Sequence, residues 1–455
     1  MNLNRFTHIY LIGIGGIGMS ALSRYFMANN KVVAGYDRMP SPLTEKLEEE
    51  GAEIHFEDDI NQILPSFLNK ENTLVIFTPA IPAEHKELNF FREQEYVLLK
   101  RSQVLGLISR DKYCLAIAGT HGKTTVSSMT AHILHQGEMG CNAFLGGIAS
   151  NYNSNLIINE DSENLVVEAD EFDRSFLQLS PDLAVITSMD ADHLDIYSNH
   201  QALQKSFQEF VNLLPPKGKL LVKLGLEKDL QTEVDVYTYS LEDDRADFRI
   251  ADLWLKEGRY NFTIIGPNLK IDNIQLEMPG KLNVENALAA SALAYLCDEN
   301  PEIIKNALYN FRGVKRRMEY IIKREDLIYL DDYAHHPTEL KASIQSVKAL
   351  FPDKKITGIF QPHLYSRTRD FLDDFAKSLA LLDQLILLEI YPAREKAIPG
   401  INSQLLLEKI PMKNKILLQR NALIPYLKSI SPQVIISLGA GDIDRLVNKI
   451  KENFK

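Results

Sequence analysis

Short apolar runs rich in β-branched residues alternate with helical patterns from one end of this chain to the other. This alternation predicts parallel sheets joined by helical crossovers, which is an α/β fold. A chain of 455 residues is longer than one hydrophobic core usually organises, and we expect three α/β domains. The predicted strands are Ile9–Ile12, Val32–Tyr36, Leu74–Thr78, Leu115–Ala118, Leu165–Glu168, Leu183–Thr187, Lys219–Val222, Leu327–Leu330, Ile356–Phe360, Gln384–Leu388 and Val434–Leu438.

The predicted domain boundaries follow from this pattern. Residues 1–109 are expected to form a Rossmann-like domain, and residues 110–313 a central α/β domain of the phosphate-loop ATPase type. Residues 314–455 begin with a basic segment and are expected to form a second Rossmann-like domain. The segment 237–277 alternates polar and apolar residues with few long helical patterns, so it predicts a small antiparallel appendage on the central domain.

Composition excludes several classes of protein. The formal charge of −11 argues against a nucleic-acid partner, because binding phosphate backbones requires concentrated lysine and arginine. No apolar run reaches the roughly 18 residues of a membrane span, so no membrane partner is expected. The cysteines Cys114, Cys141 and Cys297 have no metal-site or disulfide spacing, which favours a cytoplasmic protein. Composition is compatible with a monomer or a dimer.

The segment Gly119-Thr120-His121-Gly122-Lys123-Thr124-Thr125 lies between an apolar strand and a helical pattern. Such a turn directs backbone amides and a helix N-terminus at one point, where a triphosphate can bind. Lys123 can neutralise phosphate oxygens, and the Thr124 hydroxyl can bind Mg²⁺. The usual spacing would place glycine at Ile117, so the loop is shortened. The alternative is a turn that only caps the helix.

A second glycine motif, Gly13-Ile14-Gly15-Gly16-Ile17-Gly18, also follows a strand and precedes a helix. Asp37 ends the next strand, and together they resemble a dinucleotide-binding fingerprint. Alone, this motif would favour an NAD-dependent dehydrogenase. Because the glycines only permit close approach, the same turn suits any diphosphate, including a UDP-linked ligand. Tight packing of strand and helix is the remaining alternative.

Two acidic segments follow predicted strands of the central domain, Glu168-Ala169-Asp170-Glu171-Phe172-Asp173 and Met189-Asp190-Ala191-Asp192-His193-Leu194-Asp195. Both should lie at the carboxyl edge of a parallel sheet, where ligands bind. Clustered carboxylates repel one another unless cations neutralise them. Each segment alone could be a solvated loop, but two of them beside a phosphate loop indicate Mg²⁺ sites.

Together, these segments and three others resemble the Mur ligases over nearly the whole chain. The further segments are Asn283-Val284-Glu285-Asn286-Ala287, Arg316-Arg317 with Asp331-Asp332-Tyr333-Ala334-His335-His336-Pro337-Thr338-Glu339, and Phe360-Gln361-Pro362-His363. The resemblance implies an ATP-dependent ligase that uses Mg²⁺. Within the family, the chain looks most like the members that join L-alanine to the lactyl carboxylate of UDP-N-acetylmuramate. The alternative within the family is the recycling ligase that attaches a whole tripeptide to the same nucleotide sugar.

The resemblance also implies roles for individual residues. Catalytic roles fall to Lys123, Glu168 and His193, and metal binding to Thr124, Glu168 and His193. ATP contacts are expected from Gly119, Thr120, His121, Gly122, Lys123, Thr124, Thr125, Asn283, Asn286, Arg317 and Asp332. The nucleotide sugar is expected at Gly15, Gly16, Ile17, Gly18, Met19, Ser20, Asp37, Thr78 and Arg101. L-alanine is expected at Tyr333, His335, His363 and Arg367.

Two positions depart from the family pattern. Leu282 stands where a histidine is common, and Leu364 stands where related ligases often carry a second arginine. The amino-acid carboxylate is therefore expected to pair either with Arg367 alone or with Arg369 in addition.

Overall fold

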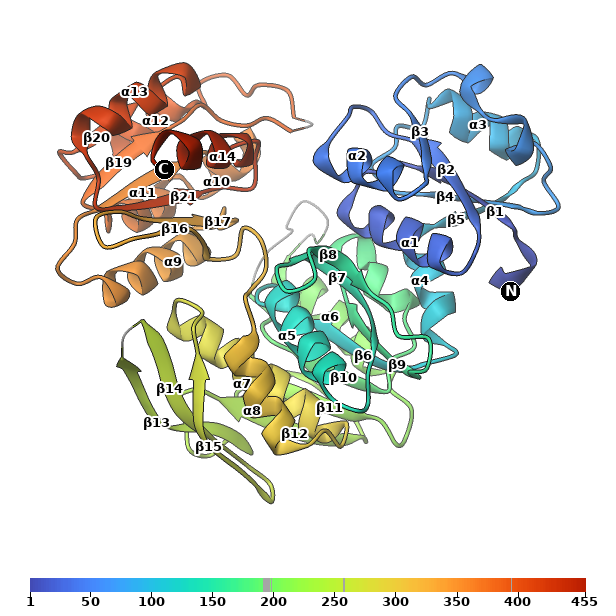
Figure 1. The fold of residues 1–455 in the computed structure, drawn as a ribbon, viewed down its shortest axis with the longest axis horizontal. Coiled ribbons are helices and arrows are strands. Elements are labelled where there is room, and N and C mark those ends of the chain that lie inside the picture. Colours follow the sequence, from blue (N-terminus) through green and yellow to red (C-terminus); the bar gives the residue numbers. More distant parts are fainter. Residues whose placement is uncertain (191–196, 198, 257, 394) are drawn as a thin grey trace. The chain divides into compact units, whose positions relative to one another are not determined.

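A computed structural model describes residues 1–190, 197, 199–256, 258–393 and 395–455 (Figure 1). Within these residues the strands form three sheets, of five, ten and six strands. The chain divides into two compact units, and each is described by itself. The first is Met1–Trp254, Asn261–Gln275 and Glu285–Phe311, and the second is Leu255–Tyr260, Leu276–Val284 and Arg312–Lys455.

The strands predicted from the apolar runs are all present. The ends of each predicted strand differ by at most two residues from those of a strand in the structure. The alternation of strands and helices is likewise confirmed along the whole described chain.

The first sheet is parallel, with the strand order β3-β2-β1-β4-β5. Because β1 lies between β2 and β4, the strand order reverses beside β1, and open parallel sheets bind ligands beyond the carboxyl ends of strands at such a point. The elements are β1 (His8–Ile12), β2 (Val32–Tyr36), β3 (Glu53–His55), β4 (Thr73–Phe77), β5 (Val97–Lys100), α1 (Ile17–Ala28), α2 (Pro42–Glu49), α3 (Lys86–Glu93), α4 (Arg101–Ser109) and the 3-10 helices Leu3–Arg5, Ile60–Gln62 and Pro65–Phe67.

The second sheet has the order β15-β14-β13-β12-β11-β10-β6-β9-β7-β8, with β6 in its interior. Residues 114–118 of β6 are fully buried, as expected for a parallel strand covered on both faces. Its strands are β6 (Tyr113–Ala118), β7 (Asn142–Ala149), β8 (Ser154–Ile157), β9 (Asn164–Glu168), β10 (Leu183–Ile186), β11 (Lys219–Lys223), β12 (Asp235–Ser240), β13 (Phe248–Lys256), β14 (Arg259–Gly266) and β15 (Leu269–Leu276). The helices are α5 (Lys123–Gln136), α6 (His200–Val211), α7 (Lys281–Leu296), α8 (Pro301–Asn310) and the 3-10 helices η4 (Phe172–Gln178) and Leu226–Asp229.

The segment predicted as a small antiparallel appendage contains the strands β13, β14 and β15, and these strands also extend the main sheet. Strands β13, β14 and β15 are joined by short connections, which can link only antiparallel neighbours. However, β13 pairs in parallel with β12, and Tyr237 lies in β12, which pairs in parallel with β11. This pairing joins Tyr239 and Ser240 of β12 to Phe248 and Arg249 of β13, so it covers part of an edge that would otherwise be unpaired.

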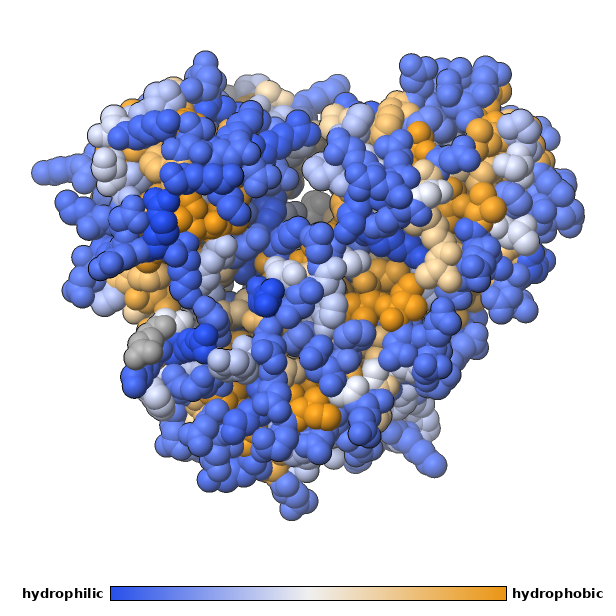
Figure 2. Space-filling model, viewed as in Figure 1, coloured by the Kyte–Doolittle hydropathy of each residue, from blue (hydrophilic) through white to orange (hydrophobic). Residues whose placement is uncertain are grey.

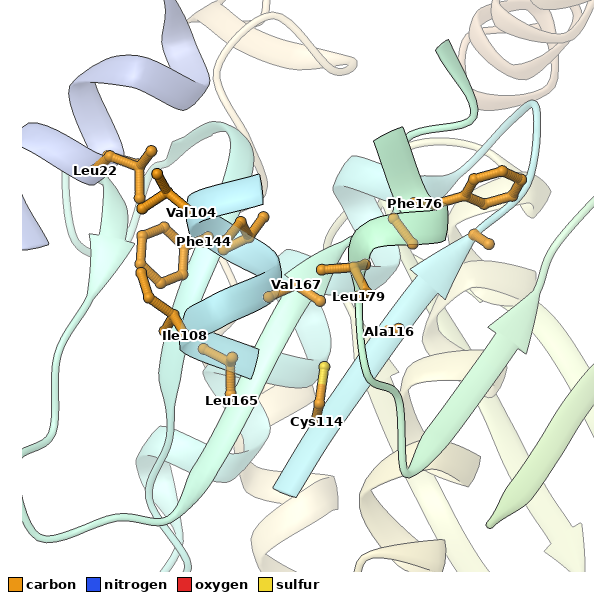
Figure 3. Close-up of a cluster of buried hydrophobic side chains, with 14 of the residues drawn as sticks. Leu22, Val104, Ile108, Cys114, Ala116, Phe144, Leu165, Val167, Phe176 and Leu179 are labelled. Carbon is orange, nitrogen blue, oxygen red and sulfur yellow. The ribbon is translucent and has the colours of Figure 1, made fainter. Parts of the chain in front are cut away.

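One cluster of buried apolar side chains continues from the helices of the first sheet to the second sheet (Figure 3). Leu22 of α1 and Val104 and Ile108 of α4 lie beside Phe144 of β7 and Leu165 of β9. Separating these elements would expose this apolar surface to water, which is unfavourable. The cluster therefore holds α1 and α4 against the second sheet.

The second unit contains the third sheet, in the order β16-β17-β21-β18-β19-β20. Strand β16 is antiparallel to β17, and the other neighbours are parallel. The two faces carry separate apolar clusters, with Leu330 and Phe360 in one and Tyr329 and Ile359 in the other. The elements are β16 (Glu319–Lys323), β17 (Ile328–Asp332), β18 (Ile356–Phe360), β19 (Gln384–Leu387), β20 (Lys415–Leu417), β21 (Val434–Leu438), α9 (Pro337–Leu350), α10 (Tyr365–Asp370), α11 (Leu372–Leu379), α12 (Ser403–Lys409), α13 (Arg420–Ile430) and α14 (Asp444–Asn453).

The predicted boundaries at 109/110 and 313/314 stay predictions, because the two compact units group the first two predicted domains together. On the face shown in Figure 2, hydrophilic side chains predominate and apolar ones form scattered groups. Within the described residues, no helix combines the length and the apolar character needed to cross a membrane.

Candidate active site

The phosphate loop joins β6 to α5 and contains two glycines in the left-handed region. Gly119 has a φ of 132° and Gly122 a φ of 84°. A Cβ on Gly119 would lie 2.1 Å from Thr187 Oγ1, and one on Gly122 would lie 2.9 Å from Asn286 Oδ1. Both positions therefore require glycine. Ile117 is a fully buried residue of β6, so the departure from the usual spacing reflects a shorter loop.

The segment after β10 holds the loop in place. Ser188 Oγ accepts a hydrogen bond from the His121 amide at 2.8 Å and lies 2.9 Å from Thr120 Oγ1. The Thr187 hydroxyl donates to the His121 carbonyl, and the Asp190 amide donates to Thr120 Oγ1 at 3.2 Å. The motifs in the sequence did not indicate roles for Thr187 and Ser188. The sequence signal for these roles was the pair of hydroxyl residues that directly follows β10, the strand next to β6.

Lys123, the first residue of α5, is surrounded by oxygen atoms. Its Nζ donates to the Gly119 carbonyl at 2.7 Å and to the carboxylate oxygens of Glu171 at 2.8 and 2.9 Å. The Glu171 side chain is fully buried. Burial lowers the pKa of Lys123, but the charges of Glu171, Asp170 and Glu168 together raise it above its ordinary value. Lys123 is therefore a cation held at the loop, and Glu171 is a partner to which sequence analysis assigned no role.

Glu168 ends β9 beside the first turn of α5. Thr124 Oγ1 donates to Glu168 Oε1 at 3.1 Å, and the Gly146 amide of β7 donates to Oε2 at 3.0 Å. Neighbouring hydroxyl and carboxylate oxygens are ligands that Mg²⁺ prefers. Thr124 and Glu168 therefore fit the predicted metal role, although the described residues contain no cluster of three acidic, histidine or cysteine side chains suited to a metal. The third predicted ligand, His193, lies outside the described residues.

The remaining ATP residues predicted in the central domain differ in their surroundings. Thr125 is buried in the first turn of α5, and Asn286 of α7 faces Gly122. Asn283 donates from Nδ2 to the Pro279 carbonyl at 2.6 Å, so its amide stabilises the turn before α7. Leu282, one of the two departures from the family pattern, is exposed.

The predicted nucleotide-sugar residues gather at the carboxyl edge of the first sheet. Asp37 Oδ2 accepts a hydrogen bond from the Gly15 amide at 2.8 Å. A Cβ on Gly18 would lie 2.7 Å from Arg101 Nη1, which shows how closely the guanidinium crosses the loop. Thr78 follows β4 and contacts the same loop through its methyl group.

The predicted residues at the start of α1 have different surroundings. Met19 packs in the apolar core, and the Ser20 hydroxyl donates to the Ile17 carbonyl at 2.9 Å. Gly16 is exposed and is the N-cap residue that precedes α1. A diphosphate at this point would therefore meet backbone amides at the helix N-terminus, and the side chains of Met19 and Ser20 would not face it.

Arg317 and Asp332 flank Tyr333 in the second unit. The Arg317 guanidinium lies 5.0 Å from the centre of the Tyr333 ring. Asp332 is almost fully buried and accepts a hydrogen bond from the Ser343 hydroxyl. Burial raises the pKa of Asp332 to about 6, although Ser343 and Arg317 act in the opposite direction.

Three of the four residues predicted to bind L-alanine form a row of rings. The centres of Tyr333 and His335 are 5.2 Å apart, those of His335 and His363 are 5.9 Å apart, and Tyr391 stacks on His363 at 5.9 Å. Burial, and to a smaller degree the charge of Arg367, lowers the pKa of His335. The structure therefore brings the three predicted rings together, with the charge of Arg367 acting on His335, and adds Tyr391, which the sequence did not indicate.

Leu364, the second departure from the family pattern, has an unusual backbone conformation. Leu364 has a φ of 70°, and its amide donates to the Tyr391 carbonyl at 3.0 Å. Arg369 forms an ion pair with Asp370 at 2.7 Å, and both side chains are about half exposed. Arg369 is thus paired at the surface in this structure, and Arg367 stays the predicted carboxylate partner.

Three family models match successive parts of the chain. The model for the Mur ligase family, catalytic domain, matches residues 8–113, the Mur ligase middle domain matches 117–294, and the Mur ligase, glutamate ligase domain, matches 316–441. The chain belongs to the Mur ligase family.

Relatives of this Mur ligase are similar over its whole length. A UDP-N-acetylmuramate–L-alanine ligase of Parabacteroides distasonis is 49% identical over 454 residues, covering 99% of this chain and 98% of that protein. One of Cytophaga hutchinsonii is 50% identical over 454 residues, covering 99% and 97%. The crystal structure of the UDP-N-acetylmuramate–alanine ligase of Thermotoga maritima has a TM-score of 0.82 and 25% identity, covering 98% of this chain and 99% of that one. A murein peptide ligase of Psychrobacter arcticus shares the fold, with a TM-score of 0.71 and 22% identity over 98% of this chain and most of that one.

The three groups of predicted residues fall in three different parts of the chain that the family models match. The glycine loop of the first sheet, the phosphate loop of the second and the ring cluster of the third each lie within one matched domain. An NAD-dependent dehydrogenase would explain only the first of these groups.

Proposed function

We propose that this Mur ligase joins L-alanine to the lactyl carboxylate of UDP-N-acetylmuramate at the expense of ATP. The carboxylate attacks the γ-phosphorus, so an oxygen–phosphorus bond forms and the bond to ADP breaks. The amine of L-alanine then attacks the acyl phosphate, an amide bond forms, and inorganic phosphate leaves with the carboxylate oxygen. The products are UDP-N-acetylmuramoyl-L-alanine, ADP and phosphate, and the amine proton passes to solvent.

The observation that carries this proposal is the pairing of the phosphate loop with full-length similarity to L-alanine ligases. Lys123 is held beside the loop as a cation by Glu171 and the Gly119 carbonyl. A carboxylate and a triphosphate repel each other, so a fixed cation in a partly buried site lowers the barrier to their reaction. Relatives about 50% identical over nearly the whole chain are L-alanine ligases by name, which favours L-alanine over a tripeptide.

Mg²⁺ is expected as the cofactor because Thr124 and Glu168 present adjacent oxygen ligands at the phosphate loop. When bound, Mg²⁺ neutralises phosphate oxygens and orients the triphosphate. The chain itself holds Glu168 in place through the Gly146 amide and directs the Thr124 hydroxyl toward it. His193 remains the predicted ligand of a second ion.

In the second unit, the amino acid is expected beside the row of rings. Arg367 would pair with its carboxylate, and the lowered pKa of His335 keeps that ring neutral at pH 7, so it does not compete as a cation. The cytoplasmic location stays an expectation that rests on the three cysteines, which are buried and form no disulfide.

Phosphate release tests this function. Purified protein is supplied with ATP, Mg²⁺ and UDP-N-acetylmuramate, and either L-alanine or L-Ala-γ-D-Glu-meso-diaminopimelate is added. Release that requires both the nucleotide sugar and L-alanine is expected. Phosphate release with the tripeptide but not with L-alanine would assign the protein to peptide recycling. Phosphate release without L-alanine or the tripeptide would indicate an ATPase without amide chemistry.

A further inference from the structure

Asn155 of β8 forms a buried hydrogen-bond network with α1. Its Nδ2 donates to the Ile17 carbonyl at 2.5 Å and to Ser20 Oγ at 3.0 Å. Its Oδ1 accepts a hydrogen bond from Arg24 Nη1 at 2.5 Å. The Asn155 side chain is fully buried, and both of its amide hydrogens are donated. A satisfied polar network in a buried environment fixes one arrangement of the groups it joins.

The partners of Asn155 lie on the helix that starts at the diphosphate loop. Ile17 is the first residue of α1, and Ser20 lies in its first turn. Arg24, one turn further along, also donates from Nε to Glu50 at 2.6 Å, and its side chain is mostly buried. Asn155 therefore holds the end of α1 whose amides are expected to face the nucleotide sugar.

The same hairpin reaches the candidate metal carboxylate. Strand β8 is antiparallel to β7, and β7 is parallel to β9, which ends at Glu168. The Gly146 amide of β7 donates to Glu168 Oε2 at 3.0 Å, and a Cβ on Gly146 would lie only 2.1 Å from that oxygen. One strand of the hairpin thus contacts Glu168, and the other contacts the first turn of α1.

Apolar side chains shield this connection from water. Phe144 of β7 contacts Tyr25 of α1, with ring centres 5.4 Å apart. Leu22 and Val104 belong to the same buried apolar cluster as Phe144 (Figure 3). The polar network therefore lies beside an apolar interface, where hydrogen bonds are stronger than in water.

We propose that Asn155 is a positioning residue, which through the β7–β8 hairpin fixes the nucleotide sugar relative to Glu168 and Lys123. The inference rests on the proposed function, because the attacking carboxylate belongs to the nucleotide sugar and the γ-phosphate binds at the phosphate loop. A displacement of about 1 Å between reacting groups can cost roughly 100-fold in rate. Asn155 should therefore control kcat more than the affinity for either ligand.

The test compares Asn155→Leu with Lys46→Ala. Asn155→Leu removes the three hydrogen bonds and keeps a side chain of similar size. Lys46 of α2 donates from Nζ to the carbonyl of Asn153, the residue before β8, at 2.9 Å, but its side chain is 37% exposed. This contact is expected to contribute little, so Lys46→Ala is the matched control. For each protein, kcat, thermal unfolding and the Kd values of UDP-N-acetylmuramate and a non-hydrolysable ATP analogue are measured.

For Asn155→Leu, kcat is expected to fall at least about 10-fold, with each separate Kd changed less than about 2-fold. Lys46→Ala should resemble the parent protein in all of these quantities. An unchanged kcat in folded Asn155→Leu would overturn the proposal. The proposal would also be overturned if kcat and the affinities for both ligands fell in proportion to the unfolded fraction of the variant. That pattern would indicate that Asn155 acts in folding alone.

A coupling measurement separates this proposal from the proposed function. The Kd of the ATP analogue is measured with and without saturating UDP-N-acetylmuramate, which requires no turnover. A change in the parent protein that is lost in Asn155→Leu supports the role of Asn155 even if L-alanine is not the substrate. Equal behaviour of the two proteins overturns it, whereas failure of the proposed function appears as the absence of L-alanine-dependent phosphate release.

Discussion

Lys123 shows how single residues of this site depend on paired buried charges. Its ammonium group binds both oxygens of the fully buried Glu171 carboxylate. Removing one partner of a buried ion pair leaves the other uncompensated, which costs about 3–5 kcal/mol. A triphosphate that binds here must therefore share Lys123 with Glu171.

Lys123→Ala is expected to lower L-alanine-dependent phosphate release at least about 100-fold, because the fixed cation at the γ-phosphate is lost. Calorimetry should show nearly unchanged binding of UDP-N-acetylmuramate, which is expected at the first sheet. Lys100→Ala is the control, since Lys100 forms a half-exposed ion pair with Asp173. Full activity of Lys123→Ala would refute the assignment of the phosphate site.

Arg367→Ala is expected to raise the KM for L-alanine at least about 10-fold more than the KM for ATP, because a charge-assisted pair with the carboxylate is lost. Arg369→Ala is the matched control on the same helix, since Arg369 pairs with Asp370 at the surface. Steady-state kinetics with each substrate varied in turn provide the comparison. Equal increases in the two KM values would show that Arg367 does not anchor the carboxylate.

Glu87 predicts a pH dependence of stability in the first sheet. It is fully buried and accepts a hydrogen bond from the Tyr10 hydroxyl at 2.8 Å, and its Oε1 lies 3.4 Å from His55 Nε2. Burial raises the pKa of Glu87 to about 7. Because the folded protein binds this proton more tightly than the unfolded chain, the stabilising contribution is full below the unfolded pKa, near 4.3, and is lost as the pH rises through about 7.

Glu87→Gln cannot ionise, so its stability should not show this loss. The difference in Tm between Glu87→Gln and the parent protein should therefore shift in favour of the variant between pH 5 and pH 8. Differential scanning calorimetry at several pH values provides the measurement. A difference that stays constant with pH would contradict the raised pKa.

At the scale of secondary-structure elements, the phosphate loop depends on the conformation of its glycines. Gly119→Ala would place a Cβ against Thr187 and Ser188 in a left-handed conformation, so we expect the affinity for the ATP analogue to fall at least about 10-fold. Gly51→Ala is the control, because Gly51 has a φ of 107° but no atom near its Cβ position. It should cost only about 1 kcal/mol of stability and leave ATP binding unchanged. Similar ATP affinities for the two variants would contradict the account of the loop.

The elements that sequence analysis identified are those with continuous apolar runs, such as β6 and β21, which are buried on both faces. The β7–β8 hairpin was not identified, because glycines interrupt β7 and a buried asparagine lies in β8. No role was predicted for Glu171, because four acidic residues lie close together in the segment 168–173. The structure shows that Glu171 is fully buried and that Asp173 and Arg174, which follow it, have left-handed backbone conformations; the sequence reveals neither feature.

At the scale of the whole molecule, each sheet presents one group of candidate ligand residues near the carboxyl ends of its parallel strands. The first has the glycine loop after β1, the second has the phosphate loop after β6, and the third has the ring cluster that begins after β17. Sequence motifs predicted these three groups because parallel α/β sheets bind ligands at this edge. The hydrogen bonds that hold the first two groups in place involve Ser188, Gly146 and Asn155. These residues lie in segments without a motif, so their roles could be recognised only from the structure.

The central claim is that the lactyl carboxylate is activated by phosphorylation before the amine attacks it. UDP-N-acetylmuramate labelled with ¹⁸O in that carboxylate is incubated with the protein, ATP, Mg²⁺ and L-alanine, and the released phosphate is analysed by mass spectrometry. The account predicts one ¹⁸O atom in each phosphate and one retained in the amide. Amide formation with unlabelled phosphate would contradict it.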